Sequence, residues 1–264
     1  MARAVPAAIF LVLAGWLVAP ALAQDGAPDL RDIAVGPFSR AVAGGALPEG
    51  WQPQRFARVD RETRYSLVED DGVVVVRADS EASASGLIHP LDVDVATHPI
   101  LGWRWKIANV LRGADLRTKR GDDHPARVYV AFAFDPDRAS LLERVQYEAL
   151  RLVYGEYPPS AALNYIWASS GPVGGIVPNP YSDRARMIVV ESGDERAGTW
   201  REERRDLAAD YAAAFGGTPP RIAAIAIMSD SDDTGEAATS WFGDIVLYAR
   251  PGPRRTPDAA DYPR

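Results

Sequence analysis

The sequence contains no cysteine, which removes disulfide bonds, thiolate metal sites, iron–sulfur clusters and cysteine nucleophiles from consideration. The fold must then be held together by a hydrophobic core, and 264 residues are ample for one. The sequence also lacks a G-x-S-x-G nucleophile turn, an H-E-x-x-H metal helix and a glycine-rich phosphate loop. Several common enzyme classes are thereby excluded, and no motif identifies a catalytic residue.

Acidic residues outnumber basic residues in the sequence. Lys and Arg number 29 against 36 Asp and Glu, a formal net charge of −7, which argues against a nucleic acid as partner. Histidine is rare, with His89, His98 and His124 as the only three. In other respects the composition is that of an ordinary globular domain.

The sequence has one long apolar run, from about Ala7 to Val18. Arg3 precedes it, Pro20 breaks it, and Ala21-Leu22-Ala23 forms a small-x-small cleavage site. We expect residues 1–23 to be an export signal, so that the mature protein is periplasmic or secreted. The alternative is an uncleaved anchor, because the run approaches the length of a membrane span. No other run is long enough to span a bilayer, and without cysteine there is no site for lipid attachment behind the signal.

Short strand-like segments dominate the remaining sequence. They are rich in Val, Ile, Tyr, Phe and Trp and are separated by Gly, Pro, Asp and Ser. The segments are 51–59, 64–68, 73–78, 84–91, 100–107, 127–134, 163–168, 186–191, 222–228 and 241–249. This spacing predicts a mostly β fold, an antiparallel β-sandwich that is most simply a jelly roll, similar in shape to galactose-binding-like modules.

Two helices are predicted within the sandwich. Residues 138–154 place apolar side chains on one face at helical spacing, so this helix should lie on another element. We expect it to border the largest cleft, with Arg127, Tyr129 or Asn164 on the floor; the alternative is that it caps a sheet edge. The second begins at the N-cap Asp206 and ends before Gly216. We therefore expect a signal over 1–23, a linker over 24–34, one sandwich domain over 35–250 and a Pro- and Arg-rich disordered tail over 251–264.

Two acidic turns are the best candidates for a functional site. The first, Asp122-Asp123-His124, precedes the apolar strand that begins at Arg127. Carboxylates packed this closely need a cation, an arginine, backbone N–H groups or open water. We predict that Arg127 pairs with a carboxylate, with Asp123 as the nearest candidate. A histidine in such a turn is more often solvated than catalytic.

The second acidic turn follows the strand 222–228 and contains Asp230, Asp232 and Asp233. Its alternating oxygen ligands resemble the start of a calcium loop, although the complete EF-hand pattern is missing. The alternative is a turn in which Asp side chains bond to neighbouring N–H groups. Because a jelly roll gathers its loops at two ends, we predict that the two acidic turns meet, and that calcium stabilises the fold if the second turn binds it.

Strand alternation predicts a polar face outside the core. It places Arg104, Lys106, Arg127, Tyr129 and Asn164 away from the apolar positions of their strands. We interpret this face as the floor of a cleft for a hydroxyl-rich or carboxylate-bearing ligand, with Trp167 at a strand end as a further contact. The alternative is the solvated outer face of a sandwich.

Several of these segments together resemble one bacterial family, catalogued as domain of unknown function 3047. The resemblance covers roughly residues 38–248 and rests on these motifs: Trp103-Arg104-Trp105-Lys106, Gly121-Asp122-Asp123, Ala126-Arg127-Val128-Tyr129-Val130, Leu163-Asn164-Tyr165-Ile166-Trp167-Ala168, Trp200 with Glu203, Asp210-Tyr211 with Phe215-Gly216, and Ile225-Ala226-Ile227-Met228 before Asp230-Ser231-Asp232. It implies exported bacterial proteins without an assigned activity or catalytic residues. Where His124 stands, the family has an aromatic or aliphatic residue.

Three functions are compatible with the sequence. The first is a periplasmic binding module for a glycan or another hydroxyl-rich ligand, contacted by Asp122, Asp123, Arg127, Asn164 and Trp167. The second is a hydrolase or lyase of an envelope polysaccharide that uses one Asp from each acidic turn as an acid/base pair. The third is a structural or partner-binding envelope protein. Carboxyl groups about 5 to 10 Å apart across an open cleft would favour the second.

Overall fold

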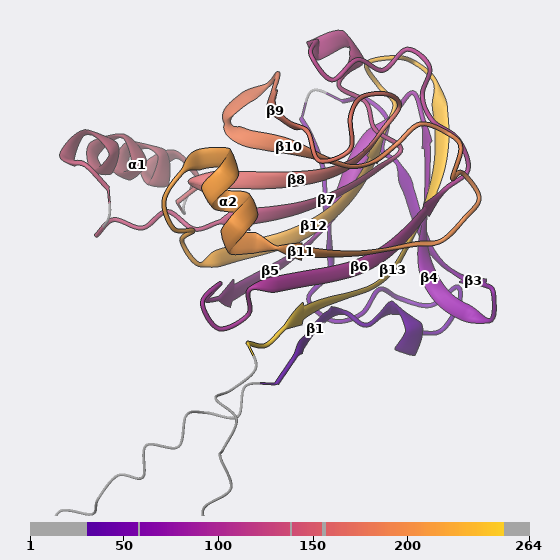
Figure 1. The fold of residues 1–264 in the computed structure, drawn as a ribbon, viewed down its shortest axis with the longest axis horizontal. Helices are drawn as coiled ribbons and strands as arrows, with labels where there is room; N and C mark the ends of the chain where they lie inside the picture. Colours follow the sequence, from indigo (N-terminus) through magenta and orange to yellow (C-terminus); the bar gives the residue numbers. More distant parts are fainter. Residues whose placement is uncertain (1–30, 58, 138, 155–156, 251–264) are drawn as a thin grey trace, which may run out of the picture.

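The structure is a computed structural model that describes residues 31–57, 59–137, 139–154 and 157–250. The expected export signal, most of the expected linker and the expected tail lie outside the described residues. The described residues form two β-sheets packed face to face, together with two α-helices (Figure 1). The expectation of a mostly β sandwich with two helices is confirmed.

The first sheet of the described chain has six strands in the order β11-β6-β13-β4-β3, with β1 also paired to β13. Its strands are β1 (Ile33–Gly36), β3 (Arg64–Asp70), β4 (Val73–Glu81), β6 (Ile100–Ile107), β11 (Arg201–Asp206) and β13 (Ala237–Tyr248). The second sheet has seven strands in the order β2-β5-β12-β7-β8-β10-β9. Its strands are β2 (Gln52–Gln54), β5 (Ala84–Val93), β7 (Ala126–Phe132), β8 (Ala161–Ala168), β9 (Ile176–Asn179), β10 (Ser182–Ser192) and β12 (Ile222–Asp230). Two short 3-10 helices span Phe38–Arg40 and Lys119–Gly121.

One strand pair departs from the antiparallel arrangement that the sequence predicts. β8 and β10 run parallel, with Asn164 opposite Met187. A parallel neighbour requires the chain to return to the starting end of the first strand. Here the edge strand β9 makes that return, since it pairs antiparallel with β10.

Aromatic side chains fill the space between the sheets. Trp103 and Trp105 of β6 pack on Tyr165 and Trp167 of β8, with ring centroids 5.2 Å and 5.9 Å apart. Trp167 is fully buried and its Nε1 donates to the Gly193 carbonyl at 3.0 Å. The expectation that Trp167 contacts a ligand is therefore not met, because both its ring and its polar atom are used within the core.

A partly buried carboxyl group borders this aromatic cluster. Glu203 accepts a hydrogen bond from Trp105 Nε1 at 3.2 Å. Burial, with a contribution from the Glu191 charge, raises the pKa of Glu203 to about 7. The folded protein thus retains a proton that the unfolded chain releases near pH 4.3, so this stabilisation is complete at low pH and is lost as the pH rises to about 7.

We expect Glu203→Gln to raise the free energy of unfolding by about 1–2 kcal/mol at pH 8, allowing for solvent screening, and to leave it unchanged at pH 4. Denaturant unfolding at the two pH values measures the difference. Glu202→Gln, at an exposed position of the same strand, serves as the matched control and should change neither value. Equal effects of Glu203→Gln at both pH values would contradict the assigned pKa.

Helix α2 (Leu207–Phe215) forms as the sequence predicts. The Asp206 carboxylate accepts hydrogen bonds from the N–H groups of Ala208 and Ala209, both at 3.0 Å, which caps the helix start. Gly216 ends the helix with a positive φ of 80°. Leu207 anchors the helix in the core.

Helix α1 (Leu141–Tyr154) also forms, but it does not bury the expected face at its described positions. Leu142 and Val145 are 69% and 68% exposed. The helix is attached instead through Tyr147, whose ring stacks on Phe134 with centroids 3.7 Å apart. It therefore lies beyond the end of the second sheet rather than on it (Figure 1). No helix in the described parts of the chain has the length and apolar character needed to span a membrane.

Candidate functional site

The two acidic turns meet beside the second sheet, where its central strand β7 begins and the neighbouring strand β12 ends. The His124 N–H donates to Asp230 Oδ1 at 3.0 Å, and the N–H groups of Asp233 and Thr234 donate to the Asp123 carboxylate at 3.3 and 2.6 Å. The prediction that the turns converge is confirmed. The cause is the antiparallel pairing of β7 with β12, which places the start of one strand beside the end of the other.

Arg127 joins the turns by a buried ion pair. It is 1% exposed, and its Nε and Nη2 donate to Asp230 Oδ1 and Oδ2 at 2.8 and 2.5 Å. Nη1 donates to Asp122 Oδ1 at 3.3 Å, and Nη2 also bonds to the Asp122 carbonyl. Arg127 is thus paired as predicted, but the prediction of Asp123 as partner is wrong. The register sets Arg127 opposite Met228, on the same face as Asp230.

The carboxyl groups of the second turn hold their protons more tightly than usual. Burial raises the pKa of Asp230 to about 7, since the Arg127 charge offsets the loss of solvation only in part. Burial and the nearby Asp123 charge also raise the pKa of Asp232 and of Asp233. Negative charge is therefore only partly compensated in this turn.

In the first turn, by contrast, the pKa values of Asp122 and His124 are lowered. Burial raises the pKa of Asp122, but Arg127 and His124 outweigh this effect and leave it lower than usual. Burial and the Arg127 charge lower the pKa of His124 to about 4, so the ring is neutral at pH 7. The ring is buried rather than solvated, neither of its nitrogens has a hydrogen-bond partner among the residues that the structure describes, and Nε2 lies 3.5 Å from Asp122 Oδ1.

A cavity of about 530 Å³ opens beside the joined turns. Four carboxylates form its acidic wall: Asp122, Asp230, Asp232 and Asp233. Two polar side chains from the β9–β10 region, those of Asn179 and Tyr181, also line the cavity. Asn179 Nδ2 donates to Asp122 Oδ2 at 3.3 Å, and the Tyr181 hydroxyl lies 2.8 Å from Asp233 Oδ2. Neither residue is recognisable from the sequence alone, because Asn179 and Tyr181 flank Pro180 in a segment without a strand pattern.

The cavity continues into a shallow hollow of about 240 Å³ over the second sheet. Both are lined by Phe56, Tyr129 and Met228. The floor of the hollow consists of alanines from three neighbouring strands: Ala131, Ala162, Ala224 and Ala226. We call the cavity and the hollow together the outer groove. Its shape follows from the register, since Ala224, Ala131 and Ala162 stand side by side across β12, β7 and β8.

Tyr129 and Asn164 stand opposite each other on the same face, two residues along β7 and β8 from Ala131 and Ala162. Both stand on the outer face with Arg127, as the alternation of their strands predicts. Asn164 is fully buried, and neither atom of its side-chain amide has a hydrogen-bond partner within the described chain.

Arg104 lies elsewhere. It belongs to β6 of the first sheet, on the opposite outer face of the sandwich, where its guanidinium stacks over Trp200 at 4.5 Å. The expected polar face combining Arg104 with Arg127, Tyr129 and Asn164 is therefore wrong. Alternation assigns a side chain to the inside or outside of its own sheet but does not show which sheet a strand joins.

The carboxylates that could hold a metal ion also differ from the expected set. Oxygen atoms of Asp123, Asp230 and Asp232 all lie within 4.8 Å of one another. Asp233, which the sequence analysis included, turns instead towards the Tyr181 hydroxyl.

A family model described as "Protein of unknown function (DUF3047)" matches residues 49–246. The chain belongs to this family. The resemblance drawn from the sequence motifs is thereby confirmed. No curated protein matches the sequence of this DUF3047 member.

Two solved structures show weak likenesses to this DUF3047 protein. The family 11 carbohydrate-binding module of the cellulosomal cellulase Lic26A-Cel5E of Clostridium thermocellum matches with a TM-score of 0.42 and 8% identity, over 84% of this chain and 97% of that one. The glycoside hydrolase domain of Spr0440, Endo-D from Streptococcus pneumoniae R6, matches with a TM-score of 0.28 and 11% identity, over 75% of this chain and 21% of that one. At this level we draw no functional conclusion from either.

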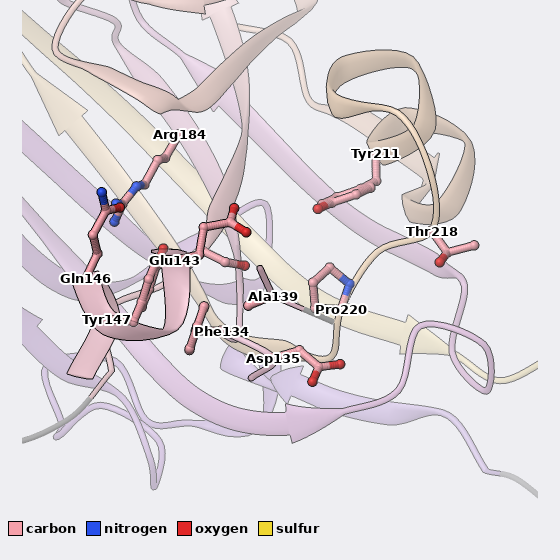
Figure 2. A pocket seen from close by; sticks show the side chains of 11 residues that line it. Phe134, Asp135, Ala139, Glu143, Gln146, Tyr147, Arg184, Tyr211, Thr218 and Pro220 are labelled. Atoms are coloured by element: carbon pink, nitrogen blue, oxygen red, sulfur yellow. The ribbon is translucent and has the colours of Figure 1, made fainter. Parts of the chain in front are cut away.

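A separate pocket of about 390 Å³ lies between α1 and the end of the sandwich in the DUF3047 protein (Figure 2). Phe134 and Tyr147 form one side, and the Arg184 guanidinium lies 4.8 Å from the centre of the Tyr147 ring. We expected α1 to border the largest cleft, with Arg127, Tyr129 or Asn164 on the floor. That expectation is wrong, because those residues stand on the face of the sheet rather than at the end where α1 projects.

Proposed function

We propose that this DUF3047 protein is an exported binding module for a glycan or another hydroxyl-rich ligand. The ligand lies along the outer groove, with hydroxyl groups directed at the acidic wall. The observation that carries the proposal is the outer groove itself. Small alanine side chains leave a hollow on the face of the second sheet, and a row of carboxylates lies beside it.

The chemistry of the outer groove suits such a ligand. Carboxylates accept hydrogen bonds from sugar hydroxyls, and charged acceptors make the stronger bonds. Phe56 and Tyr129 offer aromatic surface to the C–H groups of a ring, and Asn179 and Tyr181 add amide and hydroxyl groups. A net negative wall favours neutral or cationic ligands over anionic ones.

Several features favour binding over catalysis. Asp230 and Asp122 are bonded to Arg127, while Asp123 accepts two backbone N–H groups. Hydrolysis and a purely structural role stay as alternative outcomes of the test.

We expect Ala226→Trp to weaken glycan binding at least about tenfold, because the indole fills the floor of the outer groove. A glycan array identifies the ligand of the parent protein, and titration calorimetry with that glycan compares the variants. Ser66→Trp, at an exposed position of β3 on the first sheet, is the control and should bind like the parent. The absence of any bound glycan, or equal loss in both variants, would contradict the proposal; release of shortened glycan would favour the hydrolase.

A further inference from the structure

The outer face of the first sheet carries a row in which aromatic rings alternate with cations. Arg77 and Lys106 lie 5.8 and 4.6 Å from the centre of the Trp241 ring. Lys106 and Arg104 lie 5.2 and 4.5 Å from the centre of the Trp200 ring. All four distances are within the range of about 6 Å over which a ring attracts a cation. The strand register produces the row, since Trp241 stands opposite Arg77 on β4 and opposite Lys106 on β6.

Two glycines allow side chains to lie flat on this face. A Cβ atom on Gly243 would lie 2.4 Å from Cγ of Arg104, and one on Gly102 would lie 2.6 Å from Cε2 of Tyr248. Any other residue at these positions would displace the two side chains. The Arg204 guanidinium in turn stacks on Tyr248, 3.9 Å from the ring centre. Glycine inside a strand often marks a place that another group approaches closely, and here that group is a flat side chain.

The four cations that contact these rings differ in their ionic partners. Lys106 and Arg77 are each paired with an aspartate. Arg104 and Arg204 form no ion pair with any residue that the structure describes, although Glu202 stands opposite Arg104 in the register. Both guanidinium groups are thus fixed by a ring and keep N–H donors for a ligand.

This surface suits an extended anionic ligand that contains sugar rings. A guanidinium group binds a carboxylate through two parallel hydrogen bonds, and stacking on an aromatic ring fixes its orientation. The half-buried rings of Trp200 and Trp241 offer apolar surface to sugar C–H groups. The row crosses several strands, so a polymer covers more of it than a small molecule does. The net charge of −7 argues against a nucleic acid as that polymer.

We infer that the outer face of the first sheet binds an acidic polysaccharide. Arg104 and Arg204 hold its carboxylates, and its sugar rings lie along Trp200 and Trp241. The inference does not rest on the proposed function, because the outer groove belongs to the other sheet and its acidic wall disfavours anionic ligands. The two surfaces therefore differ in the charge of the ligand that they accept.

Titration calorimetry with an oligogalacturonate tests this surface, because each sugar of that probe carries a carboxylate. We expect binding at low salt that weakens as salt is added. Arg204→Gln should weaken binding at least about tenfold without unfolding the protein, because Arg204 is exposed. Arg120→Gln, at an exposed arginine of the 3-10 helix Lys119–Gly121, is the matched control and should bind like the parent.

NMR shows where the probe binds. The indole N–H signals of Trp200 and Trp241 should shift as oligogalacturonate is added, whereas the methyl signal of Ala226 in the outer groove should not. Ala226→Trp should leave the oligogalacturonate affinity unchanged. Failure of this inference is thereby distinguished from failure of the proposed function, which Ala226→Trp tests with a different glycan.

Four results would overturn the inference. One is the absence of oligogalacturonate binding at low salt. Another is an equal loss of affinity in Arg204→Gln and Arg120→Gln, which would indicate a general charge effect. The third is a shift of the Ala226 signal without shifts of Trp200 and Trp241. The fourth is tighter binding of a single-stranded oligonucleotide to the same two tryptophans, which would assign the surface to nucleic acid.

Discussion

Arg127→Ala is expected to lower the free energy of unfolding by about 3–5 kcal/mol, because it leaves buried carboxylates without their cation. The Arg127 side chain joins the two acidic turns, and its buried guanidinium bonds to both oxygens of the buried Asp230 carboxylate. Breaking a buried pair costs far more than the pair contributes relative to an apolar replacement. Denaturant unfolding at pH 7 gives the value directly.

The chain supplies a control for this prediction. Arg221 also pairs with an aspartate, Asp92, but both side chains are about half exposed or more. Arg221→Ala should therefore cost less than about 1 kcal/mol. If both variants unfold alike, Arg127 does not hold the turns together. The double substitution Arg127→Met with Asp230→Leu should recover part of the lost stability, since it removes both charges at once.

Trp167→Ala is expected to lower the free energy of unfolding by about 3–5 kcal/mol through the cavity that it leaves between the sheets. The ring is fully buried against Trp105. Trp200→Ala removes the same side chain from the partly exposed outer face of the first sheet and should cost clearly less.

Trp167→Phe adds a binding readout to the same test. This variant should retain the glycan affinity of the parent, because Trp167 does not reach the outer groove. A small stability loss in Trp167→Ala, or loss of glycan binding by Trp167→Phe in a folded protein, would contradict the placement of Trp167 in the core.

The sandwich could be predicted because most strands alternate apolar and polar residues, as β7 does from Arg127 to Phe132. Three strands could not, and the first of them, β1 (Ile33–Gly36), is only four residues long. β11 (Arg201–Asp206) reads REERRD and is stabilised as an edge strand by its pairing with β6 rather than by its own composition. β9 (Ile176–Asn179) contains a proline, and because proline cannot donate a ladder hydrogen bond, such a segment is not predicted as a strand.

The convergence of the acidic turns could also be predicted, but their partners could not. Sequence proximity favoured Asp123 as the partner of Arg127, whereas strand register selects Asp230, which is 103 residues away. Likewise, the floor of the outer groove depends on Ala131, Ala162 and Ala224 standing in register, and register is a property of the paired sheet rather than of one strand.

The central claim, that the outer groove binds a hydroxyl-rich ligand, is tested most directly by NMR of alanine methyl groups during titration with the glycan selected on the array. We predict that the signals of Ala131, Ala162 and Ala226 shift as the glycan is added, and that these shifts saturate with the Kd measured by calorimetry. The indole N–H signals of Trp200 and Trp241, on the opposite face, should stay unchanged. Shifts confined to these two tryptophans, with the groove alanines unaffected, would contradict the claim.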